Sequence, residues 1–475
     1  MPSEASVLTA AEAQTRARTA AIRLLRRGLT SGNRIALVAP DPRAAPGVAA
    51  RAQAAVAVLA WGALRVGIVP VMVNPVLQER ERADFIADSR VRLVLHDAEI
   101  LALSESDLGP GQGSRGIAGP SSRGLELSEV PLGRPMHFTS GTTGRSKGVW
   151  AGVMGEVEAR GYWADEQHQW GLDSADVLLN HGPLAHSAPL RFSMLALMSG
   201  ATVVYTGGFD AERTSRAIVD YRPTMAMAVP THLQRILDQP GGPPPSHYRR
   251  LVHAGSACPP DLKRGLHEWA GVDNVWEFLG STEGQFTACS GSEWEDRPGT
   301  LGRARPGRSL LIDDSGTAAE GTIWCVGPEF ARFEYFDDND KTRLAWRSTP
   351  AGPAFTVGDL GRRDDDGYLF LHGRRHDLII SGGMNVYPAE VEAELRRCPG
   401  VRDVAVFGQP DPTWGERVCA AVVGDVVGEQ VIAWTRTEVA GYRRPKRVYL
   451  VDELPLTSNG KVLREGLAAW VESHS

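Results

Sequence analysis

The sequence predicts an α/β protein: a large N-terminal body of doubly wound mixed sheets plus a small antiparallel unit, with a hinged α+β C-terminal domain. Three observations lead to this prediction. Patterns typical of buried strands and of helices alternate over roughly the first 280 residues. Short strands separated by Gly/Asp turns follow about residue 297. A compact run of helix and strand patterns then begins near residue 377, after a polar segment.

The alternation predicts βαβ units, and therefore a parallel sheet with helices on both faces. An Ala/Arg-rich helical pattern occupies residues 1–30, and a Gly/Ser/Pro-rich stretch at 104–134 is expected to be a surface connection. The expected strands are 34–40, 68–74, 91–96, 177–180, 202–205, 224–229, 251–253 and 275–278. The expected helices are 49–66, 77–87, 189–198, 211–220, 231–237 and 259–269.

The later part of the chain has a different pattern. Strands are expected at 322–326, 368–371 and 378–380, and the C-terminal piece adds a helix at 388–397, strands at 404–407 and 418–423, and a closing helix. Pro388 stands in the first turn of its helix, where proline is well tolerated. The polar run Gly-Arg-Arg-His-Asp at 373–377 separates apolar strands. We therefore expect a large domain over residues 1–375 and a small mobile domain over residues 376–475.

The composition is that of an ordinary globular protein. At 475 residues the chain is too long for a single core, and a formal net charge of −6 gives no reason to expect nucleic acid or an anionic membrane as a partner. The longest apolar run, 54–64, is too short to span a bilayer, and the N-terminus lacks the order of a secretion signal. Five scattered cysteines without CxxC spacing predict free thiols in a reducing cytoplasm.

One loop concentrates groups that bind phosphate. Residues 138–148, Phe-Thr-Ser-Gly-Thr-Thr-Gly-Arg-Ser-Lys-Gly, combine three glycines, five hydroxyl side chains and a lysine. Glycine permits close backbone approach, so that amide groups and hydroxyls can surround a phosphate while Lys147 adds a charge. The order Ser146-Lys147-Gly148 differs from the P-loop of nucleotide triphosphatases. A flexible linker is the alternative, but the largely apolar flanks and the lysine argue against it.

Lysine is rare in this chain, and its positions are therefore informative. Of 51 basic residues, five are lysines, at 147, 263, 341, 446 and 461, which leaves 46 arginines. A lysine retained in such a chain suggests a site that needs a compact ammonium rather than a planar guanidinium. Lys147 and Lys461 both lie in glycine-containing loops and are the leading candidates.

A second motif, Leu279-Gly280-Ser281-Thr282-Glu283, follows a predicted buried strand. A carboxylate at the carboxyl end of a strand, opposite a phosphate loop, can hold Mg²⁺ against phosphates. A solvated acidic loop residue is the simpler alternative for Glu283 when the segment is considered by itself.

Five motifs in order give the chain a resemblance, over about residues 30–465, to the adenylate-forming superfamily of acyl-CoA synthetases, peptide-synthetase adenylation domains and luciferases. The resemblance implies that ATP phosphates bind at Thr139, Ser140, Gly141, Thr142, Thr143, Gly144 and Lys147. It implies that Glu283 binds magnesium, that Thr282 contacts phosphate, and that Leu279, Gly280 and Ser281 lie at the nucleotide. The family usually has an aromatic residue where Leu279 stands, and leucine lacks the aromatic face that stacks on adenine.

The remaining motifs also match the family. The segment 253–257, His-Ala-Gly-Ser-Ala, resembles the lining of the adenine and acyl pockets through Gly255, Ser256 and Ala257, although an ordinary strand-to-helix turn explains it equally well. Asp359 and Arg374 resemble the pair that binds ribose. Lys461, in the loop Leu-Thr-Ser-Asn-Gly-Lys, resembles the lysine that stabilises charge moving between the carboxylate and the α-phosphate. His186 matches a position beside the acyl carboxylate, with a structural histidine as the alternative.

Two further segments resemble the CoA channel of CoA ligases. They contain Gly382 and Gly383 in one loop and Trp414 in the other, where Trp414 packs on the pantetheine arm or is a plain core tryptophan. His376 replaces the usual hinge aspartate or lysine. The resemblance as a whole implies an acyl- or aryl-CoA ligase that uses ATP, Mg²⁺ and CoA to activate a small-molecule carboxylic acid as acyl-AMP.

Three other functions stay open at this point. The acceptor of the acyl group could be a carrier-protein thiol, an amine or another nucleophile, and the arginine-rich composition is typical of a GC-rich bacterium. A catalytically silent nucleotide-binding homologue is supported by Leu279 and His376 alone, and nothing specific supports a luciferase. A pocket formed by His186, Trp163, Phe192 and Cys258, with Arg191 nearby, would suit an aryl or medium-sized acyl group.

Overall fold

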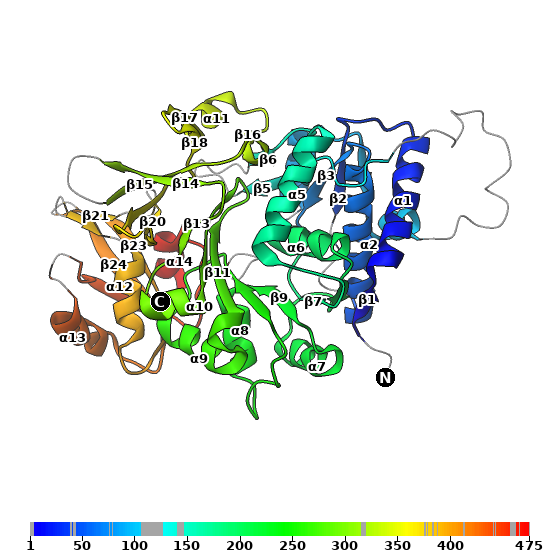
Figure 1. Ribbon diagram of the computed structural model, residues 1–475. Helices are drawn as coiled ribbons and strands as arrows, with labels where there is room; N and C mark the ends of the chain where they lie inside the picture. The colour runs from blue at the N-terminus through cyan, green and yellow to red at the C-terminus, as the bar shows by residue number, and fades with distance from the viewer. Residues whose placement is uncertain are drawn as a thin grey trace.

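The computed structural model shows several sheets joined into one elongated molecule (Figure 1). It describes the 475-residue chain except residues 1–3, 39, 41–43, 76, 78, 106–126, 140–146, 315–319, 375–376, 378, 382–383, 387, 412–413, 440, 442, 457–461, 465 and 475. The mixed α/β class and the presence of multiple sheets are confirmed.

The central sheet has eight strands, and its middle is parallel as predicted. Strands β8, β7, β9, β10 and β11 run parallel, while β1, β12 and β13 add antiparallel edges. The order across the sheet is β1 (Ser6–Leu8), β8 (Thr202–Tyr205), β7 (Val177–Asn180), β9 (Met225–Ala228), β10 (Arg250–His253), β11 (Val275–Gly280), β12 (Gln285–Ser290) and β13 (Arg303–Ala304).

Neighbouring residues in these strands belong to different hydrophobic cores. Leu178 packs in one core and Leu179 in the other, and Val203 and Val204 divide in the same way. This follows from the two-residue period of a strand, and it makes the sheet doubly wound. Helix α6 (Ser187–Met198) covers the first face, and α7 (Ala211–Tyr221), α8 (Pro230–Leu237) and α9 (Pro260–Ala270) cover the second.

The first three predicted strands form a separate parallel sheet, a detail that the sequence pattern did not predict. Its order is β3 (Val69–Val73), β2 (Arg34–Val38), β4 (Leu93–Leu95). It is accompanied by α1 (Ala10–Arg26), α2 (Pro46–Leu64), α3 (Glu79–Asp88) and α4 (Asp97–Ser104). The helices α1 and α2 approach closely at Gly62, where any side chain would collide with the Ala17 carbonyl.

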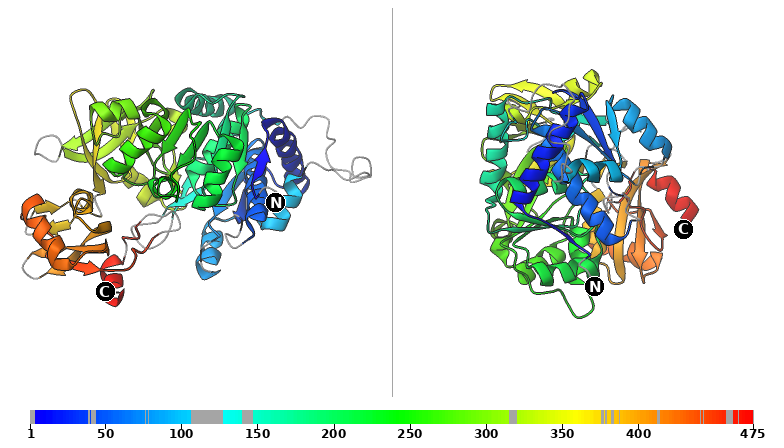
Figure 2. Two further views of the ribbon diagram at one scale, coloured as in Figure 1. Left: turned by 90° about the horizontal axis from the view of Figure 1, so that it is seen from below. Right: turned by 90° about the vertical axis from the view of Figure 1, so that its right-hand side faces the viewer.

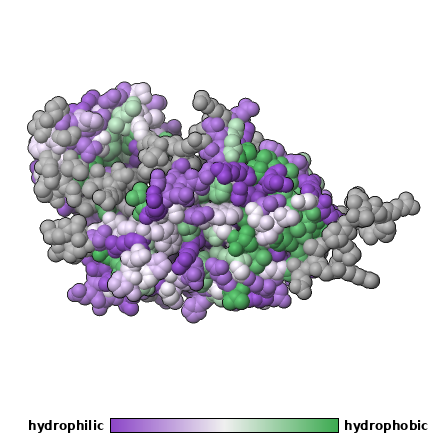
Figure 3. Space-filling view, turned by 90° about the horizontal axis from the view of Figure 1, so that it is seen from above, coloured by the Kyte–Doolittle hydropathy of each residue, from purple (hydrophilic) through white to green (hydrophobic). Residues whose placement is uncertain are grey.

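Helix α2 is longer than the apolar run noted in the sequence. By length and composition it is the one described helix that could cross a membrane, but 83% of its apolar window is buried inside the protein. It is therefore built as a core helix, packed against α1, α4 and α6. On the face of the molecule drawn in Figure 3, hydrophilic residues form a band and apolar residues lie in smaller groups beside it.

The antiparallel unit follows the central sheet, as expected. A six-stranded sheet contains β14 (Ser309–Asp314), β15 (Glu320–Val326), β17 (Trp346–Thr349), β18 (Gly352–Phe355), β19 (Asp359–Arg363) and β20 (Leu369–Arg374). A smaller sheet joins β16 (Glu334–Tyr335), β6 (Lys147–Trp150) and β5 (His137–Thr139). Helix α11 (Asn339–Ala345) connects β16 to β17, and helix α10 (Gly291–Asp296) lies between β12 and β13 of the central sheet.

The C-terminal part has its own sheet and its own two cores. The strands are β22 (Met384–Val386), β21 (Ile379–Ser381), β24 (Gly415–Gly424), β23 (Val401–Asp411) and β25 (Arg447–Leu450). Helices α12 (Pro388–Arg396) and α13 (Gly428–Glu438) contribute to one core, and α14 (Leu467–His474) to the other. Figure 2 shows this orange-to-red unit beside the yellow and green strands that precede it.

Helix α5 (Glu156–Trp170) was not predicted, and its composition explains why. Its buried positions, Ala159, Tyr162, Trp163, Glu166 and Trp170, have helical spacing, yet one of them is a glutamate. The polar residue interrupts the apolar pattern on which helix prediction depends. This helix supplies one wall of the pocket described below.

Candidate active site

The predicted phosphate loop is closed by a β-hairpin. Strands β5 and β6 pair antiparallel, with Thr139 opposite Lys147. The loop residues Ser140, Gly141, Thr142, Thr143 and Gly144 lie outside the described residues, as does the side chain of Thr139. The hairpin confirms that paired strands flank the loop, as the apolar flanks predicted.

Lys147 stands among charged residues that sequence reasoning did not group with it. Its Nζ atom lies 2.9 Å from Oδ2 of Asp338. Lys341 lies on α11 just beyond, with its ammonium 4.0 Å from the ring centroid of Tyr335. Partial burial lowers the pKa of Lys341. The pKa of Asp338 is lowered by the backbone amide of Lys341 and then by Lys147.

Glu283 joins this group through Tyr335. The Tyr335 hydroxyl donates a hydrogen bond of 2.8 Å to Oε1 of Glu283, whose residue is buried. Tyr335 belongs to β16, which pairs with β6 directly after Lys147. Two motifs 136 residues apart in the sequence, at Lys147 and Glu283, are thus connected through β16.

A single carboxylate in such surroundings fits magnesium rather than a transition metal. Mg²⁺ commonly takes one or two carboxylates together with substrate phosphates and water. The described residues contain no group of three His, Cys, Asp or Glu side chains that could hold a metal ion without a ligand. The donor set at Glu283 therefore suits a cation that arrives with nucleotide phosphates.

The predicted adenine segments meet at one edge of the central sheet. His253 and Glu277 are register partners in the parallel strands β10 and β11. Gly255, Ser256 and Ala257 follow β10, and Leu279 and Gly280 end β11. The first group is exposed and Leu279 is partly buried. The carboxyl ends of neighbouring parallel strands are the usual place for a nucleotide.

The predicted ribose pair is brought together by the antiparallel unit. Asp359 begins β19 and lies opposite Arg374 in the register of β20. Asp359 is buried, and its backbone follows Gly358, which has a φ of +82°. The side chain of Arg374 lies outside the described residues. The backbone alone thus establishes that the two residues are neighbours.

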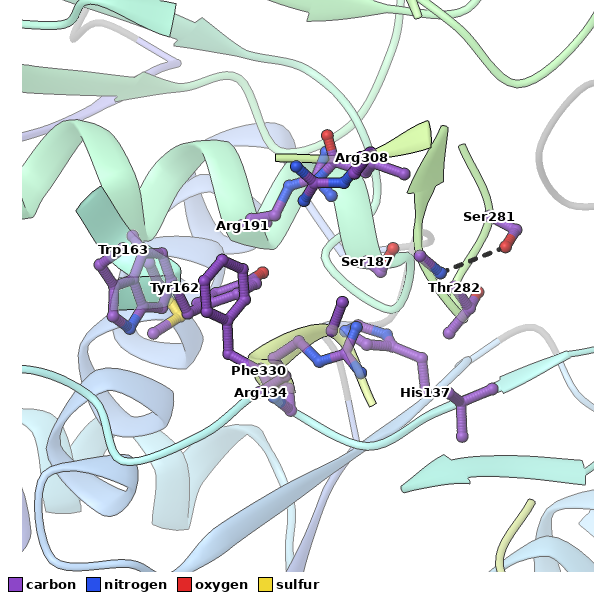
Figure 4. Close-up of a pocket in the computed structure, with 16 residues that line it drawn as sticks. Arg134, His137, Tyr162, Trp163, Ser187, Arg191, Ser281, Thr282, Arg308 and Phe330 are labelled. Carbon is purple, nitrogen blue, oxygen red and sulfur yellow. Dashed lines mark hydrogen bonds between the residues drawn. The ribbon is translucent and has the colours of Figure 1, made fainter. Parts of the chain in front are cut away.

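A pocket opens between this edge and helices α5 and α6 (Figure 4). Ser281, Thr282 and Gly284 line it on the side of the predicted nucleotide site. The other lining residues are Arg134, Pro135, His137, Val149, Tyr162, Trp163, Ser187, Arg191, Met194, Gln285, Arg308, Phe330 and Ala331. The pocket therefore joins the Ser281–Thr282 turn to an aromatic wall and several arginines.

The aromatic wall consists of Tyr162, Trp163 and Phe330. Tyr162 meets Trp163 edge-on with ring centroids 5.0 Å apart, and meets Phe330 at 6.0 Å. Trp163 donates from Nε1 to the carbonyl of Pro131, which fixes its ring. Burial raises the pKa of Tyr162. Such a wall suits an apolar or aromatic substrate body.

Trp163, which was expected in the acid pocket, is confirmed as a lining residue. Phe192 is not: it packs in the core against Trp170, with ring centroids 5.2 Å apart. The Arg191 guanidinium carbon lies 5.5 Å from the centroid of the Phe192 ring, so Phe192 packs beside this arginine without lining the pocket. Cys258 also lies away from the lining, and burial raises the pKa of its thiol to about 12.

His186 caps the start of α6 and is half-buried, and its neighbour Ser187, not His186, lines the pocket. The pocket holds a different histidine, His137, which sequence reasoning missed. Its Nδ1 lies 2.9 Å from the carbonyl oxygen of Ala185, and burial lowers its pKa to about 4. His137 is therefore neutral near pH 7 and donates from Nδ1.

Of the predicted CoA-channel residues, Trp414 is described and is 41% exposed. Its ring centroid lies 5.1 Å from Nζ of Lys446, so it is not a core tryptophan. Gly382, Gly383, His376 and Lys461 lie outside the described residues.

The rarity of lysine is informative for more positions than Lys147 and Lys461. Besides Lys147, the described lysines all occupy specific contacts: Lys341 over Tyr335, Lys446 over Trp414, and Lys263 buried against Glu277. The same signal would have found Lys341 as a member of the site. No comparable signal marked Arg134, Tyr162 or Gln285, since arginine is abundant and their positions depend on tertiary packing.

Comparisons with known proteins agree with this geometry. The model of the AMP-binding enzyme family matches residues 3–333, and that of the AMP-binding enzyme C-terminal domain matches residues 390–461. Among curated relatives, a 2-succinylbenzoate–CoA ligase of Bacillus mycoides is 30% identical, over 86% of this chain and 84% of its own. A CoA ligase of Rhodococcus jostii, named for a dioxo-octahydroindenyl propanoyl group, is 34% identical, over 70% of this chain and 64% of its own length.

The solved structures give the same result. ATP-bound MatB from Rhodopseudomonas palustris superposes with a TM-score of 0.77 at 26% identity, covering 98% of this chain and 94% of that one. The family model accounts for more than half of the chain, and the structural match extends over nearly all of it. The protein belongs to the AMP-binding enzyme family, the adenylate-forming enzymes that its motifs resemble.

Proposed function

We propose that the protein is an AMP-forming acid:CoA ligase, which joins a small-molecule carboxylic acid to AMP with release of pyrophosphate and then transfers the acyl group to the thiol of CoA. The observation that carries this proposal is the pocket that has Ser281 and Thr282 on one side and an aromatic wall on the other. It adjoins Glu283, whose neighbours Thr282 and Gly284 line it, and β16 connects Glu283 to β6, the strand that begins at Lys147. Family membership and the CoA ligases among the relatives support the same reaction.

In the first step, a carboxylate oxygen of the acid attacks the α-phosphorus of ATP, and pyrophosphate leaves. The loop from Thr139 to Lys147 holds the phosphates, with Lys147 held in place by Asp338. Magnesium, bound by Glu283, supplies positive charge against the phosphate oxygens when it is present. Asp359 and Arg374 hold the ribose, and the ends of β10 and β11 hold adenine. The protein contributes mainly position and charge.

In the second step, the CoA thiol attacks the acyl-adenylate and releases AMP. We assign the nucleotide and acid sites to a large domain, 1–375, and place Lys461 and the CoA channel at Gly382, Gly383 and Trp414 on a small mobile domain, 376–475. The separate C-terminal sheet and the exposed Trp414 support this division. A rotation of the small domain would exchange Lys461 for the channel, because the two steps need different groups at one carbonyl.

The direct test is a panel of carboxylic acids scored by pyrophosphate release, with and without CoA. We expect at least one acid to trigger release, and CoA to convert the product to a thioester. Lys461→Ala should lower acid-dependent release by about 10²–10³-fold while ATP binding, measured by calorimetry, stays nearly intact. Arg216→Ala, a change at a 62%-exposed side chain on α7, is the control and should match wild type. Equal activity of Lys461→Ala and wild type would refute its role.

The same panel decides the acceptor. An amide bond synthetase from Marinactinospora thermotolerans shares the fold at 25% identity with a TM-score of 0.76, so an amine acceptor is a specific second candidate. Thioester formation with CoA supports the ligase. Product formation with an amine or a carrier protein, and none with CoA, would replace it.

We also propose a cytoplasmic location. All five cysteines are free thiols, four of them buried, which suits a reducing compartment. Oxidised disulfides in protein isolated from its natural host would contradict this assignment.

A further inference from the structure

The acid pocket contains more positive charge than the surrounding protein neutralises. Four arginines, Arg134, Arg191, Arg305 and Arg308, surround the end of the pocket beside α5 and α6, and three of them line it. Their carboxylate partners are Asp165 and Glu166. Buried Glu283 is a further negative charge near Arg134, so four cations against three anions leave a surplus of one positive charge among these described residues. A pocket that bound an apolar tail alone would gain nothing from this surplus, since burying charge is costly.

The carboxylates of Asp165 and Glu166 already accept hydrogen bonds from side chains other than Arg191. Asp165 receives both Nη atoms of Arg308, at 3.0 and 2.9 Å, and Nη2 of Arg305 at 3.0 Å. Oε1 of Glu166 receives Nη1 of Arg305 at 3.0 Å and Nε2 of Gln285 at 2.6 Å. These bonds alone connect α5 to β12 and to the segment that follows β13. A structural cross-link therefore does not require Arg191.

Arg191 leaves more buried donors unpaired than the other three arginines: two of its nitrogen atoms lack an acceptor among the described residues, against one each in Arg134 and Arg305. Its Nε lies 3.3 Å from Oε2 of Glu166, an ion pair without hydrogen-bond geometry. Its Nη2 atom is buried and finds no hydrogen-bond acceptor among the described residues. The side chain is 11% exposed, and Figure 4 shows it leaving α6 toward the pocket between the aromatic wall and Arg308. A buried guanidinium with an unsatisfied N–H group lacks an acceptor that a ligand can provide.

Arg134 adds a second positive charge to the pocket, from the wall opposite Arg191. It donates to two carbonyl oxygens, those of Glu283 and Arg332, and to no carboxylate among the described residues. Burial and, among the neighbouring charges, Arg191 lower its pKa. Two poorly neutralised guanidinium groups thus face one pocket, and both would gain from an anion placed there.

We propose that the substrate carries a second anionic group, in the simplest case a dicarboxylic acid, and that Arg191 determines this specificity. The inference depends on the proposed function, because it places the reacting carboxylate at the Ser281–Thr282 side of the pocket. The second carboxylate accepts hydrogen bonds from the Nη atoms of Arg191, whose planar fork matches a carboxylate. The aromatic wall covers the body of the acid between its two ends. Arg191 acts on binding and positioning, not on the chemical step.

The test compares acids matched in length: hexanoate with hexanedioate, octanoate with octanedioate, and 4-methylphenylacetate with 4-carboxyphenylacetate. For wild type, we expect kcat/KM for pyrophosphate release to be higher for the diacid in at least one pair, by about 100-fold. Arg191→Gln should lower the diacid value by about 100-fold and leave the monoacid value within about threefold. Arg191→Lys should recover part of the preference, because it keeps the charge.

The exposed variant Arg216→Gln is the control for the loss of one arginine and should behave as wild type. A preference for the monoacid in every pair, or an equal loss for both members of each pair in Arg191→Gln, overturns this inference while the ligase assignment stands. The absence of pyrophosphate release with every acid overturns the proposed function and this inference with it. A diacid preference that Arg191→Gln abolishes, with the fold confirmed by a cooperative thermal unfolding transition, supports both.

Discussion

Two groups of buried charges lie on opposite faces of the central sheet, and they are built on different plans. Beneath β10 and β11, Lys263 donates to Oε2 of Glu277 at 2.5 Å and lies 3.1 Å from Nε2 of His253. That group holds one cation, one anion and a histidine whose pKa burial lowers well below its ordinary value. On the other face, Arg191, Arg305, Arg308, Asp165 and Glu166 leave positive charge in excess.

This difference distinguishes a group of charges that stabilises the fold from an arginine that we propose binds an anionic group of the substrate. The Lys263 group does not line the described pocket and is balanced within itself. Arg191 lines that pocket and has a donor without an acceptor among the described residues. Removing a cation should therefore lower the free energy of unfolding much more at Lys263 than at Arg191. Four predictions test this difference, and they are given from the largest expected effect to the smallest.

The largest effect is expected from Lys263→Met. It leaves the buried Glu277 carboxylate without its cation, which should lower the free energy of unfolding by about 3–5 kcal/mol. Thermal and urea unfolding at pH 7.5 measure this change. The double variant Lys263→Met/Glu277→Leu removes both charges and should recover most of the loss. A stable single variant would show that the pair contributes little, and the comparison would fail.

The second prediction concerns a buried group with no ionic partner. His181 is 1% exposed, and neither ring nitrogen has a hydrogen-bond partner among the described residues. Burial and nearby His232 lower its pKa to about 3. The unfolded chain therefore takes up the proton more readily, and stability that is present above pH 6.5 is lost as the pH falls toward 3.

His181→Phe should remove this loss, which amounts to about 2 kcal/mol between pH 7.5 and pH 5 for this one group. Urea unfolding at both pH values measures it. His168→Gln, at an exposed position on α5, should keep the acid sensitivity of wild type. An unchanged pH dependence in His181→Phe would mean that other groups, such as His137, account for it.

The third prediction tests the link between the two nucleotide motifs. Tyr335→Phe removes the hydroxyl that donates to Glu283, a bond to a charged group worth roughly 1.5–3 kcal/mol. We expect the KM for Mg·ATP to rise about tenfold, together with a fall of a few degrees in the unfolding temperature. Steady-state pyrophosphate release at varied Mg·ATP measures it. An unaltered KM would separate Glu283 from nucleotide binding.

The smallest effect on stability is expected from Arg191→Gln. Glu166 loses a buried ion pair at 3.3 Å but keeps its bonds to Arg305 and Gln285, so the free energy of unfolding should fall by about 1 kcal/mol, well below the loss for Lys263→Met. Thermal unfolding of Arg191→Gln and Lys263→Met under the same conditions compares the two losses of stability directly. A loss as large as that of Lys263→Met would make Arg191 a structural cross-link and remove the basis for a second anionic group on the substrate.

Much of the fold was predictable because its signals are local. The strands at 177–180 and 202–205 have the predicted bounds, since short apolar runs between turns carry a two-residue period. Helices α4, α5, α10, α11 and α13 were missed. In α5 the reason is visible: its buried face contains Glu166, whose partners on β12 and beyond β13 cannot be known from the helix itself.

The site residues also fall into two groups, those that local sequence motifs indicate and those that only tertiary packing brings together. Lys147, Glu283 and Asp359 could be predicted to bind phosphate, metal and ribose because each stands in a short run of sequence that resembles a family motif. The acid pocket was not, because its lining comes from residues as distant as Arg134, Arg191 and Arg308. Arginine is so frequent here that none of them stood out, and only packing shows that Arg191 leaves the most buried donors without an acceptor among the described residues.

The most direct test of the central claim is to capture the intermediate. Enzyme mixed with ATP, Mg²⁺ and the best acid of the panel, without CoA, is quenched and analysed by mass spectrometry. We expect acyl-AMP and pyrophosphate in amounts close to that of the enzyme, and, on addition of CoA, equal amounts of acyl-CoA and AMP. ADP and phosphate as products, or acyl-CoA formed without any acyl-AMP, would contradict the account.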